Sequence, residues 1–529
     1  MPKNTGESEW LIGQLTRDWS RKAPPESSKI KLNQLVSKLG FFYEKLRNAI
    51  DYNEEHLIRR ASLKRLLNRQ VKFLGERDPL KVSETIIFEF IRAKYLPNDT
   101  LAESDIENGA AIVAKYFLIL KFIAESPLPE KSKLNDWTID MMACEIDEFL
   151  FPNNKEMAIV NFMYGEMVKS ISFSKSKLSE SEQQLQIYVA VLKNLIKADQ
   201  ALIRYLLLKL YIPNWNSLTP DEAKVFCSKI WQQKQKIEAD LNHPSSYQLA
   251  AMLRPQAVYF NILRQLIEQN PEEIRAIIGD EKLLEEKIGE ICAKNYKRLR
   301  GRLIGSIIRV IIYIFFTKTV LAFILELPYD KYIAKEINWN ALAINIAFHP
   351  LLMSVIALAI KVPGDKNTEM IIAEIKKIVY GEERKLIYKT KKRLSSGSLT
   401  TLFFNFVYAV MFTVSFGFVI WILDLLGFNW LSGALFIFFL TLVSFFGFRL
   451  RNFANQYLVL PRKENLRNFL IDFFTLPIIR VGKALSTNFS KINIFLYILD
   501  FIIETPLKML IELFEKALSF ISEKREEIS

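Results

Sequence analysis

Apolar and charged residues are distributed differently in the two halves of this chain. In residues 1–300 charged residues interrupt the apolar ones throughout, whereas four long runs with few or no charges follow later. A bilayer core about 30 Å thick is crossed by about 20 apolar residues in a helix. The pattern therefore predicts a transmembrane domain over 303–448, with spans at 303–325, 341–360, 401–423 and 429–448.

The charges that flank these runs predict their orientation. Lys and Arg without any acid precede the first span, outnumber the acids in the loop 361–399, and return after the fourth span. Short loops rich in Lys and Arg tend to stay in the cytoplasm. We therefore expect a multi-pass protein of the cell membrane with both chain ends in the cytoplasm. Abundant Phe, Ile and Lys with little Gly are typical of a prokaryotic, AT-rich genome.

The region 449–529 contains apolar stretches that are too short to span. Charges interrupt them at Asp472, Arg480 and Asp500. Thr505 and Pro506 then have the residue types of an N-cap and a first helical residue, and an amphipathic pattern follows them. We expect interfacial or amphipathic helices here, lying on the membrane or docked on the bundle. A re-entrant hairpin, or two further short spans, is the alternative.

The first 300 residues carry helix signals and no convincing strand alternation, so the predicted fold class is all-α. Three helix starts place an oxygen at the N-cap and a carboxylate three residues later: Ser179 with Glu182, Thr219 with Glu222, and Asn270 with Glu273. Loop signals divide the region into one helical segment over residues 1–126 and a second over residues 127–280. We expect both segments to lie in the cytoplasm.

A stalk is predicted between this region and the membrane. No proline occurs from Glu281 to Leu325, so 281–302 is expected to form a helix continuous with the first span. At 1.5 Å per residue such a helix would be about 67 Å long. It would connect the cytoplasmic domain to the bilayer.

One lysine lies inside the first span. Lys318 is near its middle, and a lysine at such a depth usually faces a protein interior or a water-filled cavity. In the second span His349 comes out at a similar depth, with Asn345 four residues earlier on the same helix face. We predict a polar cluster of Lys318, Asn345 and His349, in which a neutral histidine could accept a hydrogen bond from the ammonium group. No carboxylate is expected at that depth in the four spans.

A second candidate site is the cationic helix 57–74. It contains six cations and no acid: Arg59, Arg60, Lys64, Arg65, Arg69 and Lys72. Such a surface could contact anionic lipid headgroups or nucleic-acid phosphates. The ordinary explanation is a solvated helix face, or one that pairs with acids elsewhere in the domain. Because no nucleic-acid recognition motif accompanies it, anionic lipid is the favoured partner.

Composition excludes several classes of protein. Half of the residues are hydrophobic and the mean hydropathy is +0.10, which is high for a soluble protein of this size. Three scattered cysteines form no disulfide framework, and three distant histidines show no metal-binding spacing. Nucleotide-binding and hydrolase motifs are missing. The acids of "CEIDEFL" (144–150) are expected on a solvated helix face, and no cofactor or metal is predicted.

These observations favour a non-enzymatic, membrane-bound scaffold or interaction protein. Its partners would be the bilayer, through anionic headgroups, and a protein of unknown identity on the cytoplasmic domain. The alternative is a transporter or channel that uses Lys318, Asn345 and His349. A membrane-attached nucleic-acid binder and a novel lipid-modifying enzyme are further possibilities.

Overall fold

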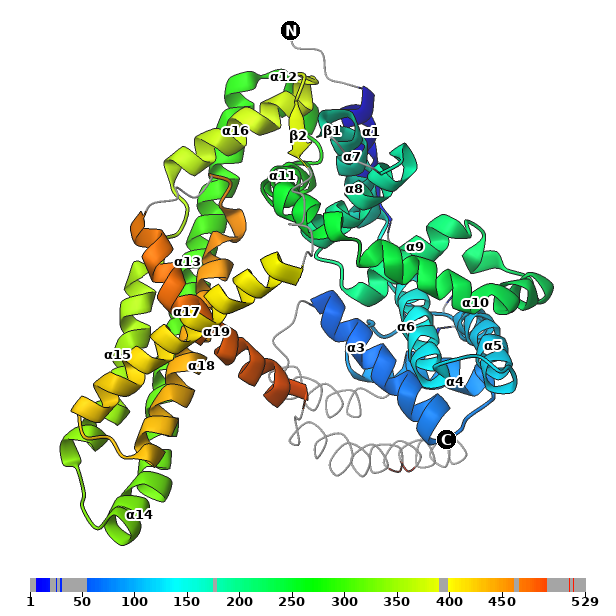
Figure 1. Ribbon diagram of the computed structural model, residues 1–529. Helices are drawn as coiled ribbons and strands as arrows, with labels where there is room; N and C mark the ends of the chain where they lie inside the picture. Colours follow the sequence, from blue (N-terminus) through cyan, green and yellow to red (C-terminus); the bar gives the residue numbers. More distant parts are fainter. Residues whose placement is uncertain are drawn as a thin grey trace, which may run out of the picture. The chain divides into compact units, whose positions relative to one another are not determined.

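The structure is a computed structural model that describes residues 6–19, 25, 29–30, 55–174, 178–389, 398–460, 466–491, 513 and 517 (Figure 1). Within these residues helices dominate, and two four-residue strands accompany them. The predicted all-α fold class is therefore confirmed. The chain forms two compact units, and the division between them falls inside α11 (Pro244–Gln269), at residue 254.

The first of these units, called the helical unit here, contains mainly Glu7–Ile171 and Lys177–Leu253. Amphipathic helices bury their apolar faces against one another, and fully buried side chains such as Tyr116, Tyr205 and Trp215 lie in its core. Its elements are α1 (Gly6–Thr16), α3 (Glu55–Leu67), the π-helix η2 (Asn68–Phe73), α4 (Pro79–Arg92), α5 (Glu103–Glu125), α6 (Lys131–Leu150), α7 (Asn154–Ser170), α8 (Glu180–Leu195), α9 (Gln200–Tyr211), the 3₁₀-helix η3 (Trp215–Ser217) and α10 (Pro220–Leu241).

Two of the three predicted helix starts are confirmed. Ser179 caps α8 and Thr219 caps α10, each in a reciprocal capping box with the glutamate three residues on. The third start is wrong, because α12 (Ile274–Gly279) begins after Glu273 and has no side-chain cap. The side chain of Asn270 instead donates to the carbonyl oxygen of Leu266, at the end of the preceding helix.

The second unit, called the span unit here, is formed mainly by Arg254–Ile494. Its elements are α12, α13 (Glu281–Leu321), the π-helix η4 (Ala322–Glu326), α14 (Leu327–Tyr329), the π-helix η5 (Asp330–Ala334), α15 (Trp339–Ala359), α16 (Asp365–Tyr380), α17 (Ser398–Leu425), α18 (Trp430–Ala454), the 3₁₀-helix η6 (Asn455–Tyr457) and α19 (Leu466–Lys491).

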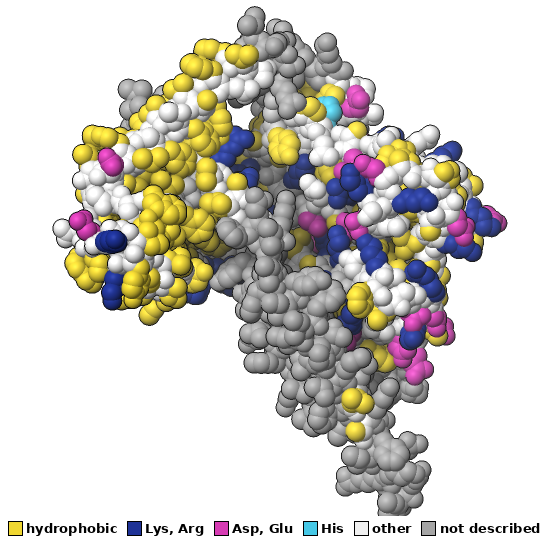
Figure 2. Space-filling model, turned by 60° about the horizontal axis from the view of Figure 1, so that its bottom comes forward, with side chains coloured by type: hydrophobic (Ala, Val, Ile, Leu, Met, Phe, Trp, Pro, Cys, Tyr) yellow, Lys and Arg dark blue, Asp and Glu magenta, His cyan; other side chains and the backbone are white. Residues whose placement is uncertain are grey.

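Among the described residues of the span unit, four helical stretches are long and apolar enough to cross a membrane. They are Glu281–Ala334, Trp339–Ala359, Thr401–Leu425 and Trp430–Tyr457, and we call them the candidate spans. Each overlaps one of the four spans expected from the sequence and contains it, except for one residue at the end of the second span and one at the start of the fourth. On the face seen in Figure 2, apolar side chains gather over the span unit, whereas charged side chains of both signs are scattered over the helical unit.

Helix α13 runs without a break from the predicted stalk, 281–302, into the first predicted span, and the first candidate span includes both. An asparagine ties the stalk to two other elements. The side-chain nitrogen of Asn367, on α16, donates to the Tyr296 hydroxyl of α13 at 2.9 Å and to the carbonyl oxygen of Tyr457 at 2.8 Å. Its side-chain oxygen accepts from the backbone of Val459 at 2.9 Å. Asn367 therefore fixes α16 against α13 and the end of the fourth candidate span.

A short sheet is present that the sequence did not lead us to expect. Strands β1 (Ile171–Ser174) and β2 (Leu386–Lys389) pair with each other, and the rings of Phe173 and Tyr388 lie 5.0 Å apart. Each strand has only four residues, so its alternation is too short to stand out. The pairing also joins segments that are far apart along the chain.

Helix α19 packs against α17 and α18. Gly482 lies at the α18 contact, where an added Cβ would overlap the carbonyl oxygen of Thr441 and lie 2.9 Å from the Cβ of Phe445. The guanidinium of Arg480 lies 4.8 Å from the ring centre of Tyr408 on α17. These contacts dock α19 on the candidate spans. The predicted amphipathic helix after Pro506 lies outside the described residues, apart from Leu513 and Ala517, and stays a prediction.

The substitution Gly482→Ala is expected to destabilise this docking by about 1–3 kcal/mol, because the new methyl group has no space beside a backbone carbonyl. The measurement is the thermal unfolding of the detergent-purified chain. Gly417→Ala on α17 is the matched control, since nothing lies within 4 Å of an added Cβ there. Equal unfolding temperatures for the two variants would contradict the described contact of α19 with α18.

Candidate functional site

Two polar residues that the sequence places in the first two spans meet in the folded chain. The ammonium nitrogen of Lys318, on α13, lies 2.5 Å from the side-chain oxygen of Asn345, on α15. Neither side chain has any exposed surface. The ammonium group also lies 4.6 Å from the ring centre of Phe439 on α18, a cation–π contact. The lysine of the first candidate span is therefore enclosed by contacts with the second and fourth candidate spans.

A carboxylate completes this cluster. Glu326, at the end of η4, is fully buried and places Oε1 3.9 Å from the ammonium nitrogen of Lys318. The side-chain nitrogen of Asn345 lies 2.7 and 2.6 Å from the two oxygens of Glu326. The carboxamide therefore bridges cation and anion, with its oxygen toward Lys318 and its nitrogen toward Glu326. We call Lys318, Glu326, Asn345 and His349 the span cluster.

The position of Glu326 corrects the sequence analysis, which expected no carboxylate at this depth and ended the first span at residue 325. Eight α-helical residues turn through about 800°, which would leave Glu326 about 80° away from the face of Lys318. However, Ala322–Glu326 is π-helical, and the wider π turn takes more residues. The reduced winding brings Glu326 to the lysine. Apolar periodicity carries no signal for a π turn, so the sequence analysis placed Glu326 in a loop.

His349 belongs to the span cluster, but both of its ring nitrogens face backbone carbonyls. Its Nδ1 lies 3.2 Å from the carbonyl oxygen of Asn345, and its Nε2 lies 3.0 Å from that of Phe436. The expectation that His349 accepts a hydrogen bond from Lys318 is therefore wrong, since both ring nitrogens face acceptors. A neutral imidazole has one N–H group and donates to one of these carbonyls at a time. The ring contributes packing, 4.7 Å from the Phe436 ring centre.

The span cluster holds helices together. Its four side chains have no surface accessible to water, and Lys318 has its counter-charge within the chain. Polar groups that satisfy one another across apolar helices stabilise helix association in membranes. In this conformation the arrangement fixes α13, η4, α15 and α18 against one another.

The cationic helix 57–74 is formed by α3 and η2, and acids of the same unit meet it. Arg59 pairs with Asp147 at 2.6 Å, and Lys64 pairs with Asp140 at 2.5 Å. Further pairs join Arg60 to Asp147 and Asp199, and Lys72 to Asp136. Arg65 donates to Ser62, and Arg69 is half-buried on η2. Contact with anionic lipid stays a prediction, and it would have to compete with these carboxylates.

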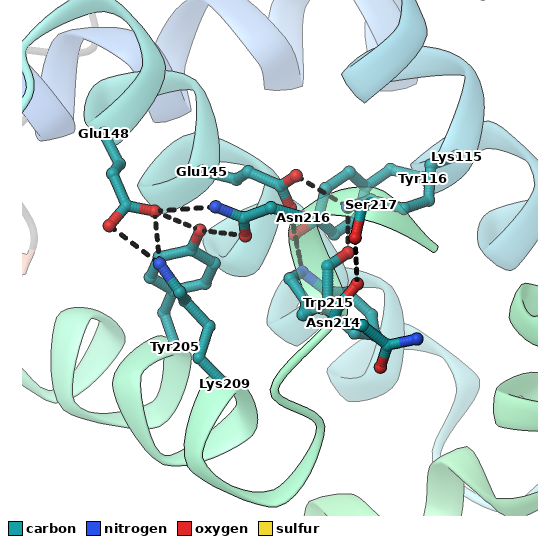
Figure 3. A network of polar contacts seen from close by, with 10 residues as sticks. All are labelled: Lys115, Tyr116, Glu145, Glu148, Tyr205, Lys209, Asn214, Trp215, Asn216 and Ser217. Atoms are coloured by element: carbon teal, nitrogen blue, oxygen red, sulfur yellow. Dashed lines mark hydrogen bonds and ion pairs between the residues drawn. The ribbon is translucent and has the colours of Figure 1, made fainter. Parts of the chain in front are cut away.

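The acids of 144–150 lie mostly inside the helical unit, so the predicted solvated face is wrong. Glu145 is 2 % exposed and accepts hydrogen bonds from three side chains (Figure 3). Lys115 and Tyr116 of α5 lie 2.6 and 2.7 Å from its oxygens, and the indole nitrogen of Trp215 lies 2.8 Å away. We call these four residues the Glu145 network. It joins α5, α6 and η3 through one carboxylate.

Glu148, one turn further along α6, forms a second network. Both of its oxygens lie 2.8 Å from the ammonium nitrogen of Lys209, and the hydroxyl of Tyr205 lies 2.7 Å from Oε2 (Figure 3). Asn216 of η3 donates to Oε2 at 3.2 Å. Glu148 thereby fixes α6 to α9 and η3. The sequence signal for both networks is the spacing of two glutamates at i and i+3, but their partners come from distant segments.

Burial and pairing together set the ionisation of these groups. Burial lowers the pKa of Lys115, although the charge of Glu145 opposes the shift. Burial raises the pKa of Tyr116 well above its ordinary value, so that the phenol stays neutral. Burial alone would raise the pKa of Glu148, but hydrogen bonds from Lys209, Tyr205 and Asn216 outweigh it and lower the pKa overall. Both networks therefore pair hydrogen-bond donors with carboxylates inside the helical unit.

Metal and thiol chemistry find no support in the described ranges. Within them, no group of three or more His, Cys, Asp or Glu side chains could hold a metal ion. Cys144, Cys227 and Cys292 are buried free thiols, and in the helical unit burial raises the pKa of Cys144 and Cys227 above the ordinary value. None of the three comparisons, with protein-family models, with curated proteins and with solved structures, gives a match.

Proposed function

We propose that this chain is a non-enzymatic, membrane-bound interaction protein of the cell membrane. The candidate spans would hold the helical unit at the cytoplasmic face, where it would bind a protein partner. The excess of Lys and Arg in the segments 294–302 and 361–399 supports this orientation, since cationic segments tend to stay in the cytoplasm. The size of the helical unit supports the proposed interaction role, because a protein that served only as a membrane anchor would need no domain of this size.

One observation carries the choice of a scaffold over a transporter. Lys318 and Glu326 have no exposed surface and compensate each other's charge, with Asn345 between them. A transport site must meet water from at least one side, whereas a structural cluster gains from being sealed. The span cluster is sealed in the described conformation.

The same pair favours transport as the second candidate function. Proton and ion relays in membranes use carboxylates next to basic groups, and Glu326 supplies such a carboxylate beside Lys318. A transporter would need a second conformation in which water reaches these two side chains. It would also need Lys318 and Glu326 themselves, whereas a scaffold needs only their packing.

The experiment uses a double variant, Lys318→Met with Glu326→Leu, which removes both charges together. For a scaffold, crosslinking in the native cells is expected to capture one defined set of proteins with the wild type and with this variant. That set is expected to be lost when residues 1–280 are deleted. Flux of protons or ions in reconstituted vesicles that disappears in the double variant would instead establish transport and overturn the scaffold proposal.

A further inference from the structure

The helical unit contains a groove that the function proposed above does not use. It has a volume of about 680 Å³ and lies between η2, α5 and α6. Pockets of about 300–1,000 Å³ that are mostly apolar, with a few polar groups, are typical sites for small molecules. Its floor is apolar, with Phe117, Leu120 and Ala124 on one face of α5 and with Val71 and Ile139 from the neighbouring elements.

Among the described residues, the charged groups that line the groove are all cations. Lys72, Arg77 and Lys121 belong to its lining, and no carboxylate of the described part of the chain does. Lys72 pairs with Asp136, and Lys121 lies 4.0 Å from Glu125; in both pairs the two side chains are well exposed. Exposed pairs of this kind contribute little and exchange partners readily. Arg77 donates to the carbonyl oxygen of Val71 at 3.3 Å and has further N–H groups for a ligand.

A polar group inside the groove is also without a partner. The side-chain oxygen of Asn135 is buried and forms no hydrogen bond with any described residue. A carboxamide can present either its oxygen or its nitrogen to a neighbouring group. Buried polar atoms are normally hydrogen-bonded, so this one indicates a missing partner. The π-helix η2 forms one wall, and π-helical turns occur frequently at functional sites.

We propose that this groove binds a single-chain anionic amphiphile, namely a long-chain fatty-acid carboxylate. The hydrocarbon chain would lie on the apolar face of α5, and the carboxylate would meet Lys72, Arg77 and Lys121. The volume lies within the range of small-molecule sites, and the cations at an apolar floor complement a hydrocarbon chain with a single anionic end. This binding would be independent of the scaffold role.

The probe is palmitate that carries a photoreactive diazirine, added to the full chain in phosphatidylcholine nanodiscs. After illumination, mass spectrometry is expected to find the label in peptides that contain residues 117–124. Ala124→Trp, which fills the groove from an exposed position, is expected to reduce this labelling about tenfold or more. The triple variant Lys72→Gln, Arg77→Gln, Lys121→Gln is expected to reduce it similarly, because charge-assisted hydrogen bonds to the carboxylate are lost.

The matched control neutralises three exposed lysines that also have acidic partners, in the variant Lys133→Gln, Lys224→Gln, Lys385→Gln. It is expected to label like the wild type. Equal labelling by the corresponding fatty alcohol, or full labelling of Ala124→Trp, would overturn the proposal. So would labelling that rises when residues 505–529 are deleted, because the groove would then belong to the chain's own C-terminal segment. Stronger labelling by a photoreactive phosphatidylglycerol would assign the groove to a phospholipid instead.

Discussion

The variant Glu326→Gln is expected to destabilise the chain by about 3–5 kcal/mol, because it leaves a fully buried ammonium group without its counter-charge. The glutamine keeps the size of the side chain, and its one oxygen can still accept a hydrogen bond from Asn345, although the second acceptor is lost. Most of the expected loss is therefore electrostatic. The measurement is the unfolding temperature of the chain in detergent, which is determined from the fraction of protein that stays monodisperse after heating.

Two further variants show whether the effect comes from the ion pair. Lys318→Met with Glu326→Leu removes both charges, and it is expected to recover most of the lost stability, since paired apolar replacements of a buried ion pair are often neutral or stabilising. Glu336→Gln changes an exposed glutamate after the same helix and is expected to leave the unfolding temperature unchanged. If the double variant is as unstable as Glu326→Gln, an isolated charge is not the cause.

The second large effect is expected in the helical unit. Glu145→Ala removes the acceptor shared by Lys115, Tyr116 and Trp215, and it leaves the ammonium group of Lys115 with 8 % of its side chain exposed and no carboxylate partner. Breaking a buried pair in this way costs about 3–5 kcal/mol. Hydrogen exchange of the full chain is expected to accelerate in α5, α6 and η3, while exchange in the candidate spans stays unchanged.

A rescue variant and a control accompany this prediction. Lys115→Met combined with Glu145→Gln removes the charge and keeps an acceptor for Tyr116 and Trp215, so slow exchange in α6 is expected to return to some extent. Glu125→Ala breaks an exposed pair with Lys121 on α5 and is expected to leave exchange unchanged. Slow exchange in Glu145→Ala itself would show that the network does not hold these helices.

Fold class and the candidate spans could be predicted because they depend on local signals. Long uncharged runs predict helices that can cross a membrane, and the capping boxes at Ser179 and Thr219 mark helix starts without reference to the rest of the chain. The strands β1 and β2 could not be predicted, because their pairing joins segments distant in sequence. The helix start predicted at Asn270 was wrong, because the Asn270 side chain donates a hydrogen bond to Leu266 of the preceding helix and does not cap the following one.

In the candidate sites, too, local features could be predicted from the sequence, whereas contacts between distant segments could not. Lys318, Asn345 and His349 stand out because polar residues are rare in apolar runs, and helix rise alone places Lys318 and His349 at a similar depth. Glu326 was missed because a π turn changes the helix winding. The acids Glu145 and Asp147 were expected on a solvated face because nothing local shows that Lys115, Trp215 and Arg59 approach them.

The π turn of η4 also takes up one residue more than an α-helix needs to bring the two charges together. Removing one residue from 322–325 and letting this stretch wind as an ordinary α-helix would leave seven residues, or about 700°, between the lysine and the glutamate, which is about 20° short of two turns. The glutamate would then stay near the face of Lys318, whereas an α-helix of the present length would turn it about 80° away. The charge balance between these helices therefore depends on the local winding and on the number of residues between the lysine and the glutamate, as well as on the two residues themselves.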